Sequence, residues 1–518
     1  MASPQEKLAD SLEALEALQR EGVVAVRSAD LSRTHRERLL KNGFLQEVMK
    51  GWYIPARPEE RAGDSTAWYA SFWEFCATYL EERFGEEWCL SAEQSLFLHA
   101  GRRTVPRQLL VRAPKGRNRP TALPHNTSLF DLRAELPPKG SRETLQRLRV
   151  YTLPAALVHS GAALFAENST EARAALAMVL DSSDVLAILL EGGHSTIAGR
   201  LAGAFRNVGR TRIAAEILGT MKSAGYDVRE TDPFDTPAPF TLSTRAPSPY
   251  VTRPRLMWQE MRDQLIPIFP VPPKSAVDAK SYLKQVDDVY VTDAYHSLSI
   301  EGYRVTPALI ERVRAGNWDP DNNGEDREQR NALAARGYYD AFQVVRQSVE
   351  RVLNKENPGT VADKDHGVWY RQLFAPSVTA GIVRAADLAG YRNGPVFIRN
   401  SLHVPPGREA VRDIMPLLFE LLYEETEPAV RVVLGHFIFV YIHPYFDGNG
   451  RMGRFLMNVM LAAGGYPWTV IPVERRSEYM AALEAASVES NIEPFAEFLG
   501  GLVRDNLEGK PGPKVPQT

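Results

Sequence analysis

Prolines crowd one segment of this 518-residue chain and limit what that segment can fold into. Ten of them fall between residues 233 and 273. Each lacks a backbone N–H and pushes the preceding residue towards extended geometry, so a long helix is not expected there. At roughly 150 residues per domain, the chain is long enough for about three domains. We therefore predict a linker over residues 233–274 between two folded halves.

The N-terminal half begins with helical spacing and continues into a small hairpin. Apolar periodicity predicts helices over residues 11–20 and 32–42, then short strands over 43–48 and 51–54. Helices followed by a hairpin are typical of a winged helix, which we expect over residues 1–60.

A basic run follows in the same half. Between Gln94 and Phe130 the sequence has no acidic residue. The seven cations of this stretch are Arg102, Arg103, Arg107, Arg112, Lys115, Arg117 and Arg119. Such a run is often a solvated surface, but it is also the pattern of a nucleic-acid contact. The net charge of the chain is −3, so any binding to DNA would be local, and both interpretations stay open.

Two features bear on the compartment. Cys76 and Cys89 are the only cysteines, too few for a disulfide framework or a zinc ribbon. No apolar run approaches the roughly 18 residues of a membrane span, and the N-terminus does not resemble a secretory signal. We expect a cytoplasmic protein that makes no membrane contact.

Helical spacing dominates the half after the prolines. Helices are predicted over residues 281–300, 326–350, 408–423, 429–442 and 451–463. One hairpin is expected, from Val396-Phe397-Ile398 through a turn near Asn400 to residues 402–404. The expected fold class is mainly α, with an all-α C-terminal domain that carries a small β-hairpin, preceded by an α+β region.

The most informative stretch lies at residues 443–454. It reads His443-Pro444-Tyr445-Phe446-Asp447-Gly448-Asn449-Gly450-Arg451-Met452-Gly453-Arg454. The glycines let the backbone turn sharply, and a helix start presents N–H groups and a positive dipole to an anion. Arg451 and Arg454 are three residues apart and project from one side of that helical turn. The stretch therefore predicts a phosphate-binding loop.

Two other residues of this stretch indicate chemistry. Asp447, an acid among phosphate-binding groups, is the expected ligand of Mg²⁺. His443 is placed to accept a proton from an incoming hydroxyl. A tight inter-helix turn with a structural histidine and surface arginines is the simpler alternative. The combination of base, acid, glycine loop and two cations in twelve residues favours a catalytic site.

This stretch resembles the Fic motif, His-Pro-Phe-x-(Asp/Glu)-Gly-Asn-Gly-Arg-x-x-Arg, with Tyr445 where Phe is usual. The resemblance covers residues 275–507. It implies transfer of AMP from ATP to a Ser, Thr or Tyr hydroxyl of a target protein, with pyrophosphate leaving. It also implies a flap, residues 395–403, that pairs with an extended segment of the target by strand addition.

The resemblance assigns a role to each residue of the motif. His443 is implied as the general base, and Asp447 as the ligand of Mg²⁺. Implied phosphate contacts are Gly448, Asn449 and Gly450 for the α and β phosphates, Arg451 for the leaving pyrophosphate, and Arg454 for the γ-phosphate.

A second pattern lies upstream, at Ser297-Leu298-Ser299-Ile300-Glu301-Gly302. It is similar to the inhibitory pattern of the same family, (Ser/Thr)-x-x-x-Glu-(Gly/Asn). Ser297 and Glu301 are four residues apart and share one helical face. The resemblance implies that Glu301 pairs with Arg454 and blocks the γ-phosphate. The alternative is a solvated glutamate near a helix end.

The N-terminal half has a resemblance of its own. Residues 31–53, followed by residues 91–96 and 109–114, resemble the AbiEi type of bacterial antitoxin, a winged-helix transcriptional regulator. This resemblance covers residues 5–230 and implies a contact with DNA.

The expected domains are a winged-helix-like domain at 1–60, an antitoxin-like region at 61–232, the linker at 233–274, a Fic domain at 275–510 and a tail at 511–518. The expected function is a self-inhibited protein adenylyltransferase that uses ATP and Mg²⁺. One alternative is a DNA-binding regulator whose Fic half is a sensor. Another is a Fic enzyme that removes AMP or transfers another phosphate-containing group. The oligomeric state is open, a homo-oligomer included.

Overall fold

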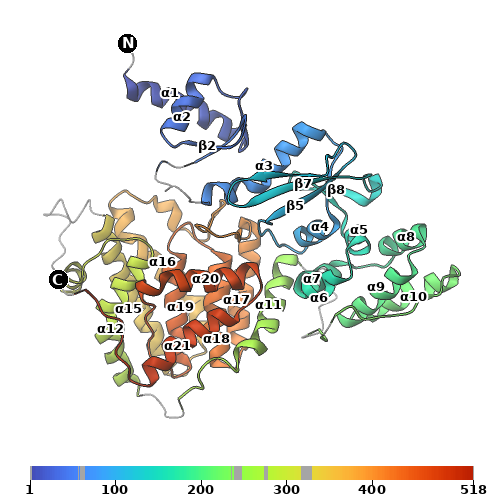
Figure 1. The fold of residues 1–518 in the computed structure, drawn as a ribbon. Helices are drawn as coiled ribbons and strands as arrows, with labels where there is room; N and C mark the ends of the chain where they lie inside the picture. The colour runs from blue at the N-terminus through green and yellow to red at the C-terminus, as the bar shows by residue number, and fades with distance from the viewer. Residues whose placement is uncertain are drawn as a thin grey trace. The chain divides into compact units, whose positions relative to one another are not determined.

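The computed structural model describes residues 3–56, 58, 65–234, 236–238, 248–273, 278–316 and 330–516. The chain divides into two compact units, whose elements are labelled in Figure 1. The N-terminal unit comprises Met1–Arg253 together with Val396–Val404. The C-terminal unit comprises Pro254–Pro395 and Pro405–Thr518.

The N-terminal unit begins with two helices and a small antiparallel sheet. The elements are α1 (Pro4–Arg20), β1 (Val26–Arg27), α2 (Arg33–Lys41), β2 (Leu45–Met49) and β3 (Trp52–Pro55), with strand order β1-β3-β2. Helix α1 starts at a capping box between Ser3 and Glu6, which satisfies two backbone donors at its N-terminus. Leu15, Leu39 and Leu45 are buried in the cluster that joins helices to strands. The predicted helices and hairpin are confirmed, while their assignment as a winged helix stays a prediction.

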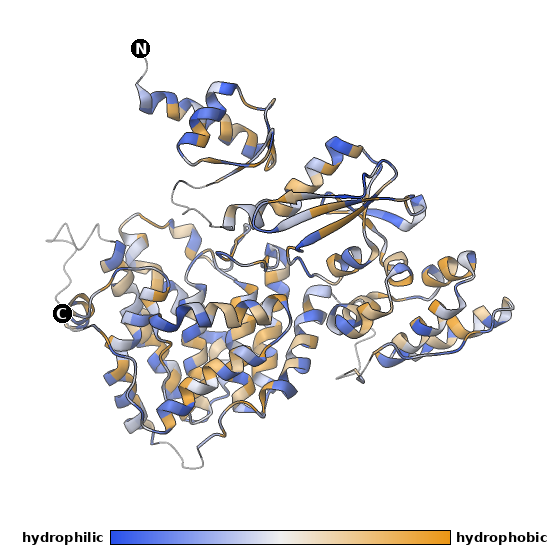
Figure 2. Ribbon diagram, in the orientation of Figure 1, coloured by the Kyte–Doolittle hydropathy of each residue, from blue (hydrophilic) through white to orange (hydrophobic). Residues whose placement is uncertain are grey.

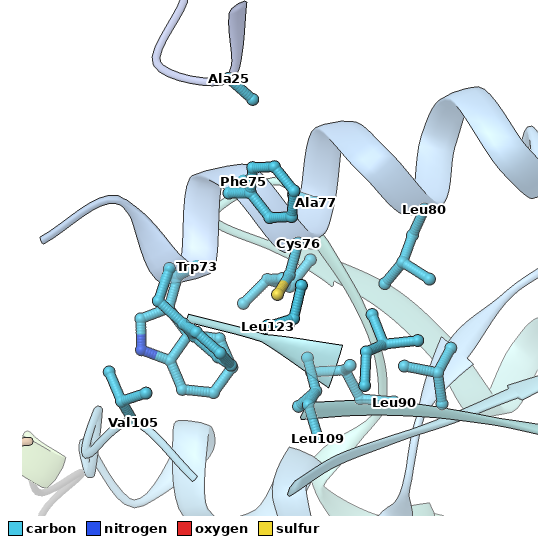
Figure 3. Close-up of a cluster of buried hydrophobic side chains, with 14 of the residues drawn as sticks. Ala25, Trp73, Phe75, Cys76, Ala77, Leu80, Leu90, Val105, Leu109 and Leu123 are labelled. Carbon is cyan, nitrogen blue, oxygen red and sulfur yellow. The ribbon is translucent and has the colours of Figure 1, made fainter. Parts of the chain in front are cut away.

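A second sheet packs against a long apolar helix. The elements are α3 (Thr66–Phe84), β4 (Cys89–Leu90), α4 (Ala92–His99), β5 (Gln108–Ala113), β6 (Arg119–Leu123), β7 (Thr127–Arg133), β8 (Arg142–Leu145) and β9 (Leu148–Tyr151). The sheet has the order β4-β5-β7-β6, in which β5 and β7 are parallel, and β8 pairs with β9 separately. Figure 3 shows Cys76 and Leu80 of α3 beside Leu90 and Leu109 of the strands. Cys76 and Cys89 are buried free thiols.

Short helices complete the N-terminal unit. They are α5 (Leu153–His159), α6 (Ala163–Glu167), α7 (Ser169–Met178), α8 (Ser183–Gly192), α9 (Ser195–Asn207) and α10 (Thr211–Ser223). Glu171 of α7 is 2% exposed and pairs with the buried Arg253 at 3.0 Å. Because both charges are out of water, removing either partner would leave an unpaired buried charge and would destabilise this region.

A helix within the proline-rich segment overturns the expectation of a helix-free linker. Helix α11 runs over Pro249–Leu265 and contains Pro254. An interior proline costs about 3 kcal/mol or more in a helix. The buried apolar side chains of α11 include Leu256, Met257, Trp258, Met261 and Leu265. Burying an apolar side chain contributes roughly 1.5–3 kcal/mol, so packing outweighs the proline. Residues 235, 239–247 and 274–277 of the predicted linker lie outside the described residues.

The C-terminal unit is built from helices. They are α12 (Ala279–Ile300), α13 (Pro307–Arg314), α15 (Arg330–Leu353), α16 (Pro358–Thr379), α17 (Arg408–Glu424), α18 (Pro428–Ile442), α19 (Asn449–Ala463), α20 (Arg476–Val488) and α21 (Glu493–Leu507). Hydrophobic and hydrophilic residues alternate in patches along them (Figure 2). Helices α18 and α19 pack together and are almost wholly buried. The mainly α class is confirmed. Residues 326–329 of one predicted helix lie outside the described residues.

The predicted hairpin near Asn400 differs from the structure. The chain turns at residues 399–400, where Asn400 has φ +59°, as expected. No strand is assigned to the described residues after β9, so the two flanks form no strand pair, although the N–H of Ser401 donates to the carbonyl of Ile398 across the turn at 3.2 Å. The physical reason is that the carbonyl of Leu402 accepts its hydrogen bond from the N–H of Val105 instead. Prolines 405 and 406 that follow have no N–H to give to a partner strand.

None of the helices in the described ranges is long and apolar enough to cross a membrane.

Candidate active site

A tight loop joins the buried helices α18 and α19. His443 ends α18 in the left-handed conformation, with φ +52°, and Gly448 precedes α19 with φ +79°. A side chain at Gly448 would bring its Cβ within 2.8 Å of Phe374 Cε2. Both the backbone angle and the close approach therefore require glycine at this position.

The side chain of Asn449 hydrogen-bonds to the backbone of this loop. Its Oδ1 accepts the N–H of Tyr445 at 2.9 Å, and its Nδ2 donates to the carbonyl of Tyr445 at 2.8 Å. The side chain is 2% exposed. The amide is thus hydrogen-bonded to the backbone at both ends, and its expected phosphate contact stays a prediction. Asn449 shapes the loop that presents the neighbouring N–H groups.

His443 has the features of a base in its neutral form. Its Nδ1 lies 3.2 Å from the carbonyl of Val440. A carbonyl can only accept, so Nδ1 carries the proton and Nε2 keeps its lone pair. Burial, with a smaller contribution from the Arg392 cation, lowers the pKa of His443 to about 4. The imidazole is therefore ready to take a proton at neutral pH.

Arg454 lies at the centre of a buried network. Its Nε donates to Ser297 Oγ at 2.9 Å, and its Nη2 donates to the Ser297 carbonyl at 3.0 Å. The same Nη2 donates to Glu301 Oε1 at 2.7 Å. The predicted pairing of Glu301 with Arg454 is present, although one carboxylate oxygen makes it and Ser297 supplies the other contacts.

Gly450 lies against this pair. A side chain there would meet Glu301 Oε1 directly and would lie 3.1 Å from Arg454 Nη1. The absence of a Cβ at Gly450 therefore lets Glu301 reach the first turn of α19. Glu301 itself follows α12 and precedes Gly302, whose φ of +86° ends that helix.

Arg451 is held by aromatic rings. Its guanidinium lies 5.1 Å from the ring centre of Tyr303 and 5.0 Å from that of Phe374. Its Nη2 is 3.4 Å from Asp447 Oδ1. The side chain is 1% exposed, and the aromatic faces stabilise its charge out of water.

Unused donors at the start of α19 fit an anion. Arg451 Nε and Arg454 Nη1 are buried and have no hydrogen-bond partner among the described residues. A buried unpaired donor costs roughly 1–3 kcal/mol, so an incoming phosphate oxygen would relieve that cost. The helix N-terminus adds favourable dipole in the same place.

Asp447 is the one acid in the loop. Its side chain is 58% exposed, and its Oδ1 accepts the N–H of Gly448 at 2.5 Å. Within the described residues, no three His, Cys, Asp or Glu side chains gather as a metal site. A hard cation at Asp447 would take its other oxygen ligands from nucleotide phosphates and water, as Mg²⁺ commonly does. An exposed carboxylate beside an anion loop fits that arrangement.

Arg392 is a residue whose role the sequence did not indicate. Its Nε donates to the His443 carbonyl at 2.8 Å and its Nη1 donates to the Gly394 carbonyl at 3.0 Å, while Nη2 donates to the Pro406 carbonyl. It is 1% exposed, and burial lowers its pKa to about 10. Arg392 therefore ties both ends of the flap to the backbone of His443. The only sequence feature that could have pointed to Arg392 is its place in Gly390-Tyr391-Arg392, just before the flap.

A second histidine of α18 also lies in a buried position. His436 of α18 is fully buried, and its Nε2 lies 2.7 Å from the Tyr479 hydroxyl. Burial lowers its pKa to about 4. Tyr445, the departure from the usual Phe, stacks on Tyr370 with ring centres 3.7 Å apart. The exchange therefore keeps the aromatic contact of the loop.

The basic run of the N-terminal unit is spread over its surface and partly neutralised. Lys115 pairs with Glu87 at 3.1 Å, and Arg102 lies 3.7 Å from Glu171. Arg112 donates to the carbonyl of Glu135 at 3.4 Å. The exposed cations of the run are Arg107, Lys115, Arg117 and Arg119.

Comparison with known proteins agrees with this geometry. Residues 369–461 match the Fic/DOC family. Curated relatives include Protein adenylyltransferase Fic of Drosophila willistoni, 28% identical over 45% of this chain and 44% of that protein, and of Drosophila virilis, 29% identical over 45% of each. The chain thus matches less than half the length of these relatives. The solved structure of Fic-1 (aa134–508) from C. elegans aligns with 17% identity and a TM-score of 0.37, over 63% of this chain and 91% of that one. The match to the Fic/DOC family covers the segment that holds His443, Asp447, Arg451 and Arg454.

Proposed function

We propose that this chain transfers AMP from ATP to a hydroxyl side chain of a target protein. The observation that supports this most is the convergence of two unsatisfied buried arginine donors with the N-terminus of α19, beside a histidine with a free Nε2. The curated relatives are named protein adenylyltransferases, which is consistent with the same reaction here.

The reaction needs a base and phosphate-binding groups in a defined arrangement. His443 Nε2 takes the proton of the target hydroxyl as its oxygen attacks the α-phosphorus. The new P–O bond forms while the bond between the α-phosphorus and its bridging oxygen to the β-phosphate breaks. Pyrophosphate leaves with that electron pair. Arg451 and the first N–H groups of α19 stabilise the charge that develops on it.

The cation and the γ-phosphate have separate partners in this proposal. Asp447 would hold Mg²⁺, which supplies charge neutralisation for the phosphates when bound. Arg454 would contact the γ-phosphate once Glu301 releases it. Asn449 acts indirectly by holding the loop through Tyr445.

Self-inhibition is part of the proposal. The Glu301 carboxylate and Ser297 together engage Nε and Nη2 of Arg454. A charge-assisted hydrogen bond contributes about 1.5–3 kcal/mol, so ATP must compete for that guanidinium. With the γ-phosphate unplaced, the α-phosphorus is not aligned for attack.

One experiment separates the chemistries. The purified chain and its Glu301→Gly variant are incubated with cell lysate and ATP labelled on either the α- or the γ-phosphate. The proposal expects protein-bound label only from α-labelled ATP, more with Glu301→Gly and none with His443→Ala. Label from γ-labelled ATP would indicate phosphate transfer. Loss of label from a pre-modified protein would indicate that the chain removes AMP, with Glu301 aligning a water.

A contact with duplex DNA is kept as a second candidate for the N-terminal unit. The exposed cations Arg107, Lys115, Arg117 and Arg119 support it, because counterion release by such residues favours binding to the phosphate backbone. Retention of the full chain on duplex DNA at low salt, abolished at high salt, tests it.

A further inference from the structure

The flap is bound by the N-terminal unit. Residues 396–404 belong to that unit, although their neighbours on both sides in sequence belong to the C-terminal unit. The N–H of Val105 donates to the carbonyl of Leu402 at 2.9 Å. Val105 is 1% exposed and lies near Trp73 in the core cluster (Figure 3), so the donor is rigidly placed.

The turn of the flap makes a second contact with the same unit. Asn400 Oδ1 accepts from the backbone N–H of Ser65 at 3.2 Å and from its hydroxyl at 3.3 Å. Asn400 has φ +59°, which directs this turn, and Ser65 precedes helix α3. Ser65 makes no side-chain cap bond to α3, so its hydroxyl is available to the flap.

Apolar packing completes the contact. Leu402 and Val404 pack against the core cluster formed by α3 and the four-stranded sheet. Between them, His403 is 3% exposed, and Ser401, before Leu402, is 7% exposed. The segment is therefore buried along residues 401–404, and its backbone accepts a hydrogen bond at Leu402, as in recognition of an extended peptide.

We propose that the surface around Ser65 and Val105 is a docking site for the flap, which an incoming target protein must displace. This rests on the proposed function and on the role that the Fic resemblance implies for the flap, which is to pair with an extended segment of the target. Strand addition would use backbone groups of the flap, and the N-terminal unit already occupies one of them, the carbonyl of Leu402. Arg392 hydrogen-bonds both to the backbone of His443 and to the carbonyl of Pro406, just after the flap. Docking therefore restrains a segment that is also attached to the backbone of the proposed general base.

The first test measures the contact without any activity. Ser65→Pro removes both donors to Asn400 and leaves the flap sequence intact, and Asn400→Gly removes the acceptor while tolerating φ +59°. Hydrogen exchange of full-length protein is followed in peptides that cover Val105 and residues 396–406. Loss of a hydrogen bond of average strength should speed exchange there by about tenfold. Ile382→Ser, at a 55% exposed position, is the matched control and should leave these peptides unchanged.

The second test measures access of targets. In the Glu301→Gly background, Ser65→Pro and Asn400→Gly should each raise AMP incorporation into lysate proteins, while binding of ATP is unchanged. Unchanged exchange in both variants overturns the docking site. Faster exchange without greater incorporation, in a chain where Glu301→Gly alone is active, overturns the displacement step. Absence of incorporation in every variant overturns the proposed function, and the exchange data then still decide the contact.

Discussion

The cations of α19 and those of the basic run, residues 102–119, have different surroundings. In α19, Arg451 and Arg454 are buried, with donors that have no partner among the described residues. In the basic run, Arg107, Lys115, Arg117 and Arg119 are exposed, and Lys115 pairs with Glu87. Of the run, only Arg103 also has a buried Nε without a partner among the described residues.

This difference teaches that a run of like charges in sequence does not by itself make an anion site. An arginine in water gains little from one more anion, because solvent and salt screen the attraction. A desolvated arginine with a free donor gains much more. Two cations in one turn of α19 therefore indicate a site more strongly than seven cations over the basic run.

The comparison between α19 and the basic run assumes that AMP transfer depends on the loop between α18 and α19. His443→Ala is the most severe test of that assumption. His443→Ala removes the base but leaves the phosphate donors, so ATP should still bind. Loss of a general base costs about 10²- to 10⁴-fold in rate. Incorporation of labelled AMP and binding of ATP are measured on the same preparation. A variant that transfers AMP at the parent rate would place the reaction elsewhere in the chain.

Glu301→Gly sharpens the comparison, because it frees one of the two buried arginines. Loss of a charge-assisted hydrogen bond of about 1.5–3 kcal/mol should raise AMP transfer by roughly 10- to 100-fold. The double variant Glu301→Gly with Arg454→Ala should fall back, since the gain needs the freed guanidinium. Glu301→Asp, one methylene shorter, should be intermediate. Equal rates for parent and Glu301→Gly would remove the inhibitory role and leave that of His443 untouched.

Asn449→Ala asks whether the arginines of α19 depend on the loop that presents them. The substitution leaves the N–H and carbonyl of buried Tyr445 without the Asn449 amide, which should cost about 1–3 kcal/mol of stability. A lower free energy of unfolding is therefore expected in the absence of nucleotide, and denaturant unfolding measures it. An unchanged free energy of unfolding combined with abolished ATP binding would instead support direct phosphate contact by Asn449.

The pH dependence of AMP transfer tests how the buried cation of Arg392 affects the pKa of His443. With a pKa of about 4, His443 stays neutral from pH 8 down to pH 5, so transfer by Glu301→Gly should hold over that range and fall as pH nears 4. Arg392→Gln removes a charge that lowers this pKa, so the acidic limb should move to higher pH by about one unit or less. An acidic limb at the same pH in both proteins would mean that the charge of Arg392 does not reach the base.

The smallest effect is expected in the basic run. Changing Arg107, Lys115, Arg117 and Arg119 to glutamine should leave ATP binding and AMP transfer within about 0.5 kcal/mol of the parent, because these positions are exposed. If the run binds DNA, low-salt retention should weaken, and the slope of log affinity against log salt should become shallower by about 0.9 for each phosphate that is no longer neutralised. Failure of this variant to bind ATP would contradict the separation of the two regions.

The sequence by itself determined the short-range features of this protein. The helices α12, α17, α18 and α19 follow apolar spacing, and the loop from His443 to Gly448 follows glycine placement. These features depend on backbone geometry and on neighbours within a few residues, which a single sequence displays. The partner of Glu301 was not given by spacing: the resemblance of residues 297–302 to the inhibitory pattern of the Fic family implied Arg454.

Only the tertiary structure decided the features that join distant residues. Packing of Trp258 and its neighbours makes a helix of the proline-rich segment, against the local preference of Pro254. The donor that the Leu402 carbonyl finds is Val105, almost 300 residues earlier, so the flap does not close into a hairpin. Asn449 directs its amide to Tyr445, and Arg392 directs its guanidinium to backbone carbonyls. In each case, a buried polar or apolar group must be satisfied by whatever the fold brings near it, and that neighbour is not written in the local sequence.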